Sequence, residues 1–171
     1  ARRQRQMCIR DSYINSVTGR NMLLWNGGCH VHEKFSVEAI IKLKQEHPEA
    51  VVMAHLECKA PVLAVADVKG STATMLHYAQ EHPEIKEYII ATEAGILHEL
   101  ERNCPDVIFY PVPPEVSEGG VGCSCNECEY MKMNSLKKIY NSLKFGWPTV
   151  EVAPEIAKDA VKPIEKMLSL S

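Results

Sequence analysis

The amino-acid sequence predicts an α/β fold with parallel strands, and three observations lead to this prediction. Four short apolar runs alternate with segments in which apolar residues recur at helical spacing. Turn-forming residues separate the two kinds of segment. No apolar run approaches the roughly 18 residues that a membrane-spanning helix needs. Strands that alternate with helices are typical of βαβ units, in which neighbouring strands run parallel.

Composition and charge narrow the class of protein. The chain has 171 residues, enough for one domain of ordinary size or two small ones. It is 46% hydrophobic and 24% charged, as globular proteins are, and its net charge of −3 argues against general nucleic-acid binding. No signal peptide is visible, and seven cysteines without the spacing of a secreted disulfide scaffold suit a reducing cytosol. We therefore expect a cytoplasmic protein without nucleic-acid or membrane partners.

Residues 1–12 differ from the rest of the chain. They are basic and aperiodic, and they resemble a translated sequencing adapter. We therefore expect them to be non-native and leave them, with Cys8, out of the fold prediction. A genuine basic N-terminal arm is the alternative.

The first half of the chain predicts two strands and three helices. The strands are residues 22–25 and 51–54. Ser36 is expected to cap a helix that Pro48 ends. Residues 61–68 suit a short helix, and Gly70-Ser71-Thr72 opens another that ends near Pro83.

The second half of the chain continues the alternation of strands and helices up to residue 110, and then a long loop and two helices are expected. A helix over residues 96–103 separates strands at 88–91 and 107–110. Residues 111–122 are rich in proline and glycine and predict a long loop, a kind of segment that is usually functional in a compact domain. Helices are expected over residues 131–144 and 154–170.

Chemically versatile side chains follow the predicted strands directly. They are Cys29 and His32 after the first strand, His55 and Glu57 after the second, and Thr92 and Glu93 after the third. Ligands of open α/β sheets bind outside the carboxyl ends of the strands. We therefore expect these segments to form one site.

A glycine-rich loop carries three cysteines, at positions 123, 125 and 128. Thiolates in a bent loop are typical ligands of zinc or of iron–sulfur clusters, and Cys29 is the best candidate for a further ligand. Zinc prefers ligands in two paired units, and no second Cys-x-x-Cys pair exists here, which favours iron–sulfur. A surface loop with incidental thiols is the alternative.

The remaining candidates each have a structural alternative. His55 and Glu57 alternate on extended chain, so both can face one side and transfer protons, or they form a loop salt bridge. Ser71 and Thr72 open a helix whose N–H groups suit a phosphate or carboxylate, or they are an ordinary cap. Structural roles are expected for His30, Cys58 and Cys104, and Glu93 either pairs with a base or caps a helix.

Five motifs in order resemble the quinolinate synthase family, over residues 13 to the C-terminus. The motifs are Trp25-Asn-Gly-Gly-Cys-His-Val-His-Glu-Lys-Phe35, Ala54-His-Leu-Glu-Cys58, Gly70-Ser-Thr72, Ala91-Thr-Glu-Ala-Gly-Ile-Leu97 and Cys128-Glu-Tyr-Met-Lys-Met-Asn134. The resemblance implies condensation of iminoaspartate with dihydroxyacetone phosphate to quinolinate, in NAD biosynthesis. It also implies a [4Fe–4S] cluster with one open iron that acts as a Lewis acid. An aspartate oxidase or aspartate dehydrogenase that supplies iminoaspartate is the implied partner.

The resemblance also implies roles for individual residues. Cys29 and Cys128 would be metal ligands, and a third cysteine would lie outside this chain. The catalytic residues would be His32, His55 and Glu57, and the substrate-binding residues Ser71 and Thr72. Leu56 stands where the family usually has proline, and the two functional side chains on either side of it, His55 and Glu57, are kept.

The implied architecture is a set of pseudo-symmetric domains, each a three-layer α/β/α unit with a short parallel sheet. Residues 13–90 would form the second domain and residues 91–171 the third, and the first would be missing, so that this chain alone is expected to be inactive. The alternative function is a non-catalytic zinc-binding or redox-sensing α/β module that uses Cys123, Cys125 and Cys128.

Overall fold

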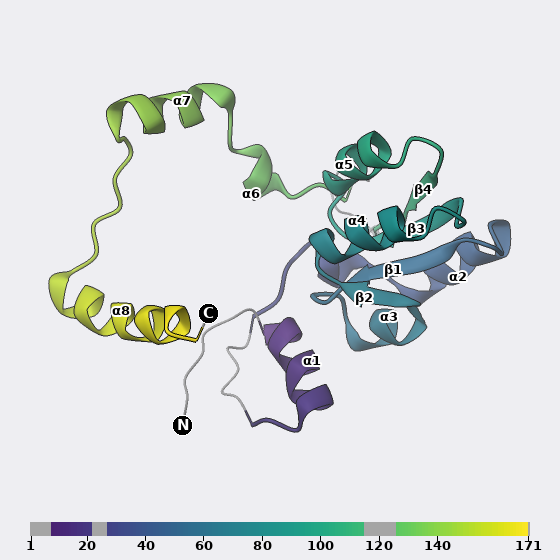
Figure 1. Cartoon of the computed structure of the whole chain (residues 1–171), viewed down its shortest axis with the longest axis horizontal. Coiled ribbons are helices and arrows are strands. Elements are labelled where there is room, and N and C mark those ends of the chain that lie inside the picture. Colours follow the sequence, from purple (N-terminus) through teal and green to yellow (C-terminus); the bar gives the residue numbers. More distant parts are fainter. Residues whose placement is uncertain (1–7, 22–26, 115–125, 171) are drawn as a thin grey trace, which may run out of the picture. The chain divides into compact units, whose positions relative to one another are not determined.

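Four parallel strands form a sheet in the order β2-β1-β3-β4 (Figure 1). The strands are β1 (Val51–His55), β2 (Val68–Gly70), β3 (Glu87–Ala91) and β4 (Ile108–Pro111). β1 pairs with β2 and β3, and β3 also pairs with β4, always in parallel. The predicted α/β class with parallel strands is therefore confirmed.

The structure is a computed structural model that describes residues 8–21, 27–114 and 126–170, with the backbone alone for residues 8–12. The strand expected at residues 22–25 lies outside the described residues, as do Cys123 and Cys125. α1 (Cys8–Thr18) begins within the segment that we left out of the prediction.

Helices cover both faces of the sheet (Figure 1). They are α2 (Val37–Glu46) and α3 (Ala60–Val65) on one face, and α4 (Thr72–Glu81) and α5 (Ile96–Asn103) on the other. Side chains alternate along a strand. In β3, Ile89 and Ala91 therefore join the apolar cluster under α2 and α3, whereas Tyr88 and Ile90 join the cluster under α4 and α5. This arrangement is a three-layer α/β/α unit.

Local hydrogen bonds explain where the helices begin. The hydroxyl of Ser36 accepts the N–H of Ala39 at 3.2 Å, so Ser36 is the N-cap of α2, as predicted. Ser71 caps α4 in the same way and forms a capping box with Thr74.

Two sequence predictions are wrong in detail. The helix expected over residues 61–68 ends at Val65, because Asp67 binds both the N–H and the C=O of Val52 and begins the pairing of β2 with β1. The single helix expected over residues 131–144 is two helices, α6 (Glu129–Lys132) and α7 (Leu136–Phe145). Ser135 separates them, because its hydroxyl caps α7 by accepting the N–H of Lys138.

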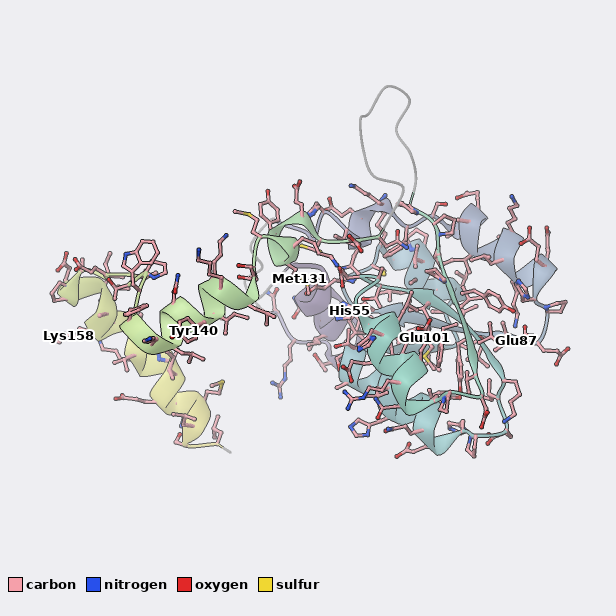
Figure 2. All side chains as sticks on the ribbon, turned by 90° about the horizontal axis from the view of Figure 1, so that it is seen from above. His55, Glu87, Glu101, Met131, Tyr140 and Lys158 are labelled. Carbon is pink, nitrogen blue, oxygen red and sulfur yellow. The ribbon has the colours of Figure 1, made fainter. Side chains whose placement is uncertain are left out.

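The chain divides into two units, Ala1–Cys128 and Glu129–Ser171. The second unit contains α6, α7 and α8 (Pro154–Leu168), none of which has a buried residue. Figure 2 shows the side chains of these helices, with Met131, Tyr140 and Lys158 labelled. The boundary expected near residue 90 falls at the end of β3, inside the sheet. The expected repetition of pseudo-symmetric domains stays a prediction.

Within the described residues, every helix is too short or too polar to span a membrane.

Tyr88 offers a test of the core. Its side chain is fully buried, and its hydroxyl has no hydrogen-bond partner among the described residues. Burial raises the pKa of Tyr88 to about 12, above the value of about 10 expected in the unfolded chain. Above pH 10 the unfolded chain therefore loses this proton first, and stability falls between about pH 10 and 12.

We predict that Tyr88→Phe leaves the free energy of unfolding at pH 7 unchanged or raises it by up to about 1 kcal/mol, because it removes an unsatisfied buried hydroxyl. The variant should also lose less stability than the wild type between pH 10 and 12. Urea denaturation at several pH values measures both effects. A loss of more than about 1 kcal/mol at pH 7 would show that the hydroxyl has a stabilising partner.

Candidate active site

The order of the strands places a candidate site between β1 and β3. From β1 the chain passes through α3 to β2, and from β2 it returns through α4 to β3 on the other side of β1. Such a reversal of strand order marks where open α/β sheets bind ligands, at the carboxyl ends of the strands. β1 ends at His55 (Figure 2) and β3 at Ala91, so the residues after each strand border this position.

His32 lies in a short 3₁₀ helix, η1 (His32–Lys34), just before α2. Val31 and Phe35 on either side are buried in the apolar cluster under α2 and α3, which anchors this turn. The side chain of His32 is only 7% exposed. Its Nε2 atom lies 3.0 Å from the hydroxyl oxygen of Thr92, and this hydrogen bond joins the turn to the end of β3.

Glu57 approaches the other side of the His32 ring. Its Oε2 atom lies 3.3 Å from Nδ1 of His32, and its side chain is 13% exposed. The geometry does not form a hydrogen bond, so Nδ1 of His32 is a buried nitrogen without a hydrogen-bond partner among the described residues. A cation or proton placed between these two atoms would be stabilised by both.

His55 stacks on His32, with ring centroids 4.5 Å apart and planes inclined by 21°. Nδ1 of His55 accepts the backbone N–H of Glu57 at 3.2 Å. Neutral His55 therefore carries its proton on Nε2. The turn after β1 thus fixes the tautomer of His55 and places it beside Glu57, with Nδ1 4.0 Å from Oε2.

Three potential metal ligands converge at this place. The ligand atoms of Cys29, His32 and Glu57 all lie within 4.8 Å of one another. Thiolate, imidazole and carboxylate together suit a transition metal rather than magnesium or calcium. Cys29 and His32 are joined by the turn in which the N–H of Glu33 donates to the C=O of Cys29 at 3.0 Å.

Burial determines the protonation of the groups around this cluster. Burial, with the neighbouring imidazoles of His55 and His30, lowers the pKa of His32 to about 4. His32 is therefore neutral near pH 7 and keeps a lone pair for a ligand or proton. Burial also raises the pKa of Cys58 to about 12, so Cys58 remains a thiol.

Cys128, Ser71 and Thr72 are not part of this converging group. The backbone N–H of Cys128 donates to Oε1 of Glu93 at 3.2 Å, and both Cys128 and Cys29 pack against the apolar cluster under α2 and α3. Ser71 follows Gly70, which pairs with His55 in the sheet, so it lies at the same edge. The roles expected for all seven site residues stay predictions.

Two contacts of the site were not predicted from the sequence. Thr92 binds His32, although its place after a strand gave it no role of its own. Cys58, expected to be structural, donates its thiol proton to the C=O of Ala91 at 3.4 Å and so ties the turn after β1 to the end of β3. Both partners are distant in sequence, and residue spacing carries no information about them.

The fold and the cluster together define an α/β protein with convergent cysteine, histidine and glutamate ligands at the carboxyl edge of its sheet. Residues 10–169 match the family described as Quinolinate synthetase A protein. The chain belongs to this family.

Curated relatives named quinolinate synthase agree with this assignment. The chain is 43% identical to that of Nostoc punctiforme over 159 residues, which cover 93% of this chain and 47% of the relative. It is 42% identical to that of Microcystis aeruginosa and 42% identical to that of Chloroherpeton thalassium, in each case over 93% of this chain and 48% of the relative. The chain therefore spans about half the length of the curated relatives that it matches.

The difference in burial between cysteines can be tested by alkylation. We predict that iodoacetamide at pH 8 modifies half-buried Cys29 at least about 100-fold faster than Cys58, because burial both shields Cys58 and raises its pKa to about 12. Peptide mapping by mass spectrometry gives the two rates. In urea the two rates should become similar. Equal rates in the folded chain would contradict the burial of Cys58.

Proposed function

We propose that this chain is part of a quinolinate synthase that condenses iminoaspartate with dihydroxyacetone phosphate to quinolinate in NAD biosynthesis. The convergence of Cys29, His32 and Glu57 at the carboxyl edge of the sheet, in a chain of this family, supports the proposal most strongly. Because the chain spans about half of its relatives, we propose that it is inactive alone and that further polypeptide completes the site.

The residues present fit a [4Fe–4S] cluster. Thiolates are its ligands, and the half-buried thiols of Cys29 and Cys128 pack against the same apolar cluster. Nδ1 of His32 is buried, lies 3.3 Å from Oε2 of Glu57 and has no hydrogen-bond partner among the described residues, so it suits a polar occupant. We propose Cys29 and Cys128 as two ligands and a cysteine outside this chain as the third. When bound, the cluster would supply a Lewis acid at its open iron.

The proposed catalytic side chains are His32, His55 and Glu57. Glu57 is largely buried beside two imidazoles and is the candidate for proton transfer. Neutral His55 presents its Nε2–H as a donor, because Nδ1 already accepts the N–H of Glu57. His32 is neutral near pH 7, because its pKa is lowered to about 4, so it would take part as an uncharged imidazole rather than as an imidazolium acid.

Ser71 and Thr72 are the proposed substrate-binding residues. They begin α4, a helix of 10 residues, at the edge of the sheet that carries His55. A helix N-terminus stabilises a phosphate or carboxylate through its N–H groups. Both proposed substrates carry such a group.

The proposal extends to the setting of the enzyme. We propose that it acts in the cytoplasm and receives iminoaspartate from an aspartate oxidase or aspartate dehydrogenase. We also propose that residues 13–90 and 91–171 correspond to two of its three pseudo-symmetric domains.

The cluster ligands are tested in the full-length protein, with the missing half restored and purified without oxygen. Cys29→Ala and Cys128→Ala should each abolish the cluster and quinolinate formation, because each removes one of only three thiolates. Cys123→Ala and Cys125→Ala are matched controls and should retain iron and sulfide. Iron, sulfide and quinolinate are measured for each variant. Stoichiometric zinc without sulfide would contradict the proposal and favour the non-catalytic zinc module.

The role of Glu57 is tested separately. In the full-length protein, Glu57→Gln should keep the cluster and the fold but lower kcat by about 10²–10⁴-fold, because an amide cannot accept the proton that a carboxylate accepts. Iron content, circular dichroism and steady-state kinetics separate these effects. Turnover within about threefold of the wild type would exclude Glu57 from proton transfer in the slow step.

A further inference from the structure

The segment at the end of β3, residues 91–95, contacts three other segments of the candidate site, and we call it the β3 turn. The C=O of Ala91 accepts the thiol of Cys58, from the turn after β1. The side chain of Thr92 binds His32, and that of Glu93 binds the backbone of Cys128. We propose that Thr92 and Glu93 are positioning residues, which fix the ring of His32 and the chain at Cys128 relative to β3. Whether these two residues affect catalysis rests on the proposed function.

Thr92 forms a hydrogen bond with one edge of the His32 ring and holds it in place. Thr92 is 2% exposed, and His32 is 6% exposed, so water does not compete for their hydrogen bond. The bond from Nε2 to the hydroxyl of Thr92 is the one hydrogen bond of the His32 ring among the described residues. The hydroxyl can donate or accept this hydrogen bond, so it does not select a tautomer, but it fixes the orientation of the ring with Nδ1 toward Glu57. A ring without this bond could rotate.

Glu93 holds the backbone of Cys128 at the β3 turn. Its two carboxylate oxygens accept two different backbone N–H groups, Oε1 that of Cys128 at 3.2 Å and Oε2 that of Gly95 at 2.8 Å. Hydrogen bonds to a charged acceptor are stronger than neutral ones. The N–H of Ala94 adds a bond to the C=O of Asn126 at 3.0 Å. Together these bonds fasten the segment before and at Cys128 to the β3 turn.

Gly95 leaves room for this arrangement. A Cβ atom at position 95 would lie 2.7 Å from Oε2 of Glu93, closer than real Cβ contacts. Gly95→Ala should therefore displace the carboxylate without changing Glu93 itself. This substitution offers a second, independent way to break the contact with Cys128.

The Thr92 contact is tested by NMR of the histidine rings in the metal-free 171-residue chain at pH 7. Wild-type His32 should give one sharp set of ring signals in ¹H–¹⁵N spectra, because the ring is held in one orientation. Thr92→Val has the same shape without the hydroxyl and should shift and broaden these signals, whereas Thr92→Ser should restore the wild-type spectrum. An unchanged His32 spectrum in Thr92→Val would overturn the role of Thr92.

The Glu93 contact is tested in the same chain by amide hydrogen exchange. Glu93→Ala and Gly95→Ala should each speed the exchange of the Cys128 N–H by about tenfold or more, as expected for the loss of a charge-assisted hydrogen bond. Glu101→Ala, an exposed substitution on α5 (Figure 2), is the control and should leave it unchanged. Unchanged exchange in Glu93→Ala would overturn the role of Glu93.

These measurements do not depend on the proposed function. They need neither a cluster nor a substrate, so a negative result removes the positioning roles and leaves quinolinate synthesis untouched. Conversely, loss of the proposed activity in the full-length protein would not change the ring signals of His32 or the exchange at Cys128.

Discussion

The parallel pairing of β1 with β3 is the constraint on which the candidate site depends. The register pairs Ala54 with Ala91, so the next residues along the two strands are His55 and Thr92, side by side at one edge. Residues of both strands are buried under helices on both faces, and a slip of one position would turn every side chain to the wrong layer. The packing of apolar side chains on both faces of the sheet therefore fixes how far His55 lies from Thr92, although neither residue belongs to the apolar clusters.

Burial gives these residues their chemistry. His32 is buried and flanked by Val31 and Phe35 of the apolar cluster under α2 and α3, so a charge on it is poorly solvated and its pKa falls to about 4. Its Nδ1 faces the carboxylate of Glu57 without a hydrogen bond among the described residues, an arrangement that is costly unless another group completes it. Natural proteins accept such costs at functional sites. The unsatisfied nitrogen is therefore typical of a functional site and does not add to stability.

The sequence predicted what is local. The β1, β3 and β4 strands, the cap at Ser36 and the helix over residues 96–103 follow from periodicity and capping, which act over a few residues. β2 was missed because it has three residues and depends on pairing through Asp67. The position of polar side chains directly after strands indicated where the site lies. The contact of His32 with Thr92 joins residues 60 positions apart, so it could not be predicted without the folded structure. The family assignment followed from five motifs and did not require any of these contacts.

We propose that Cys29, with His32 and Glu57 beside it, holds the metal centre of the complete protein. An anaerobic crystal structure of the full-length protein, with anomalous scattering measured at the iron edge, tests it most directly. We expect an iron peak within bonding distance of the Sγ atoms of Cys29 and Cys128, next to Glu57. An iron or zinc peak held by Cys123, Cys125 and Cys128, with Cys29 unbound, would contradict it.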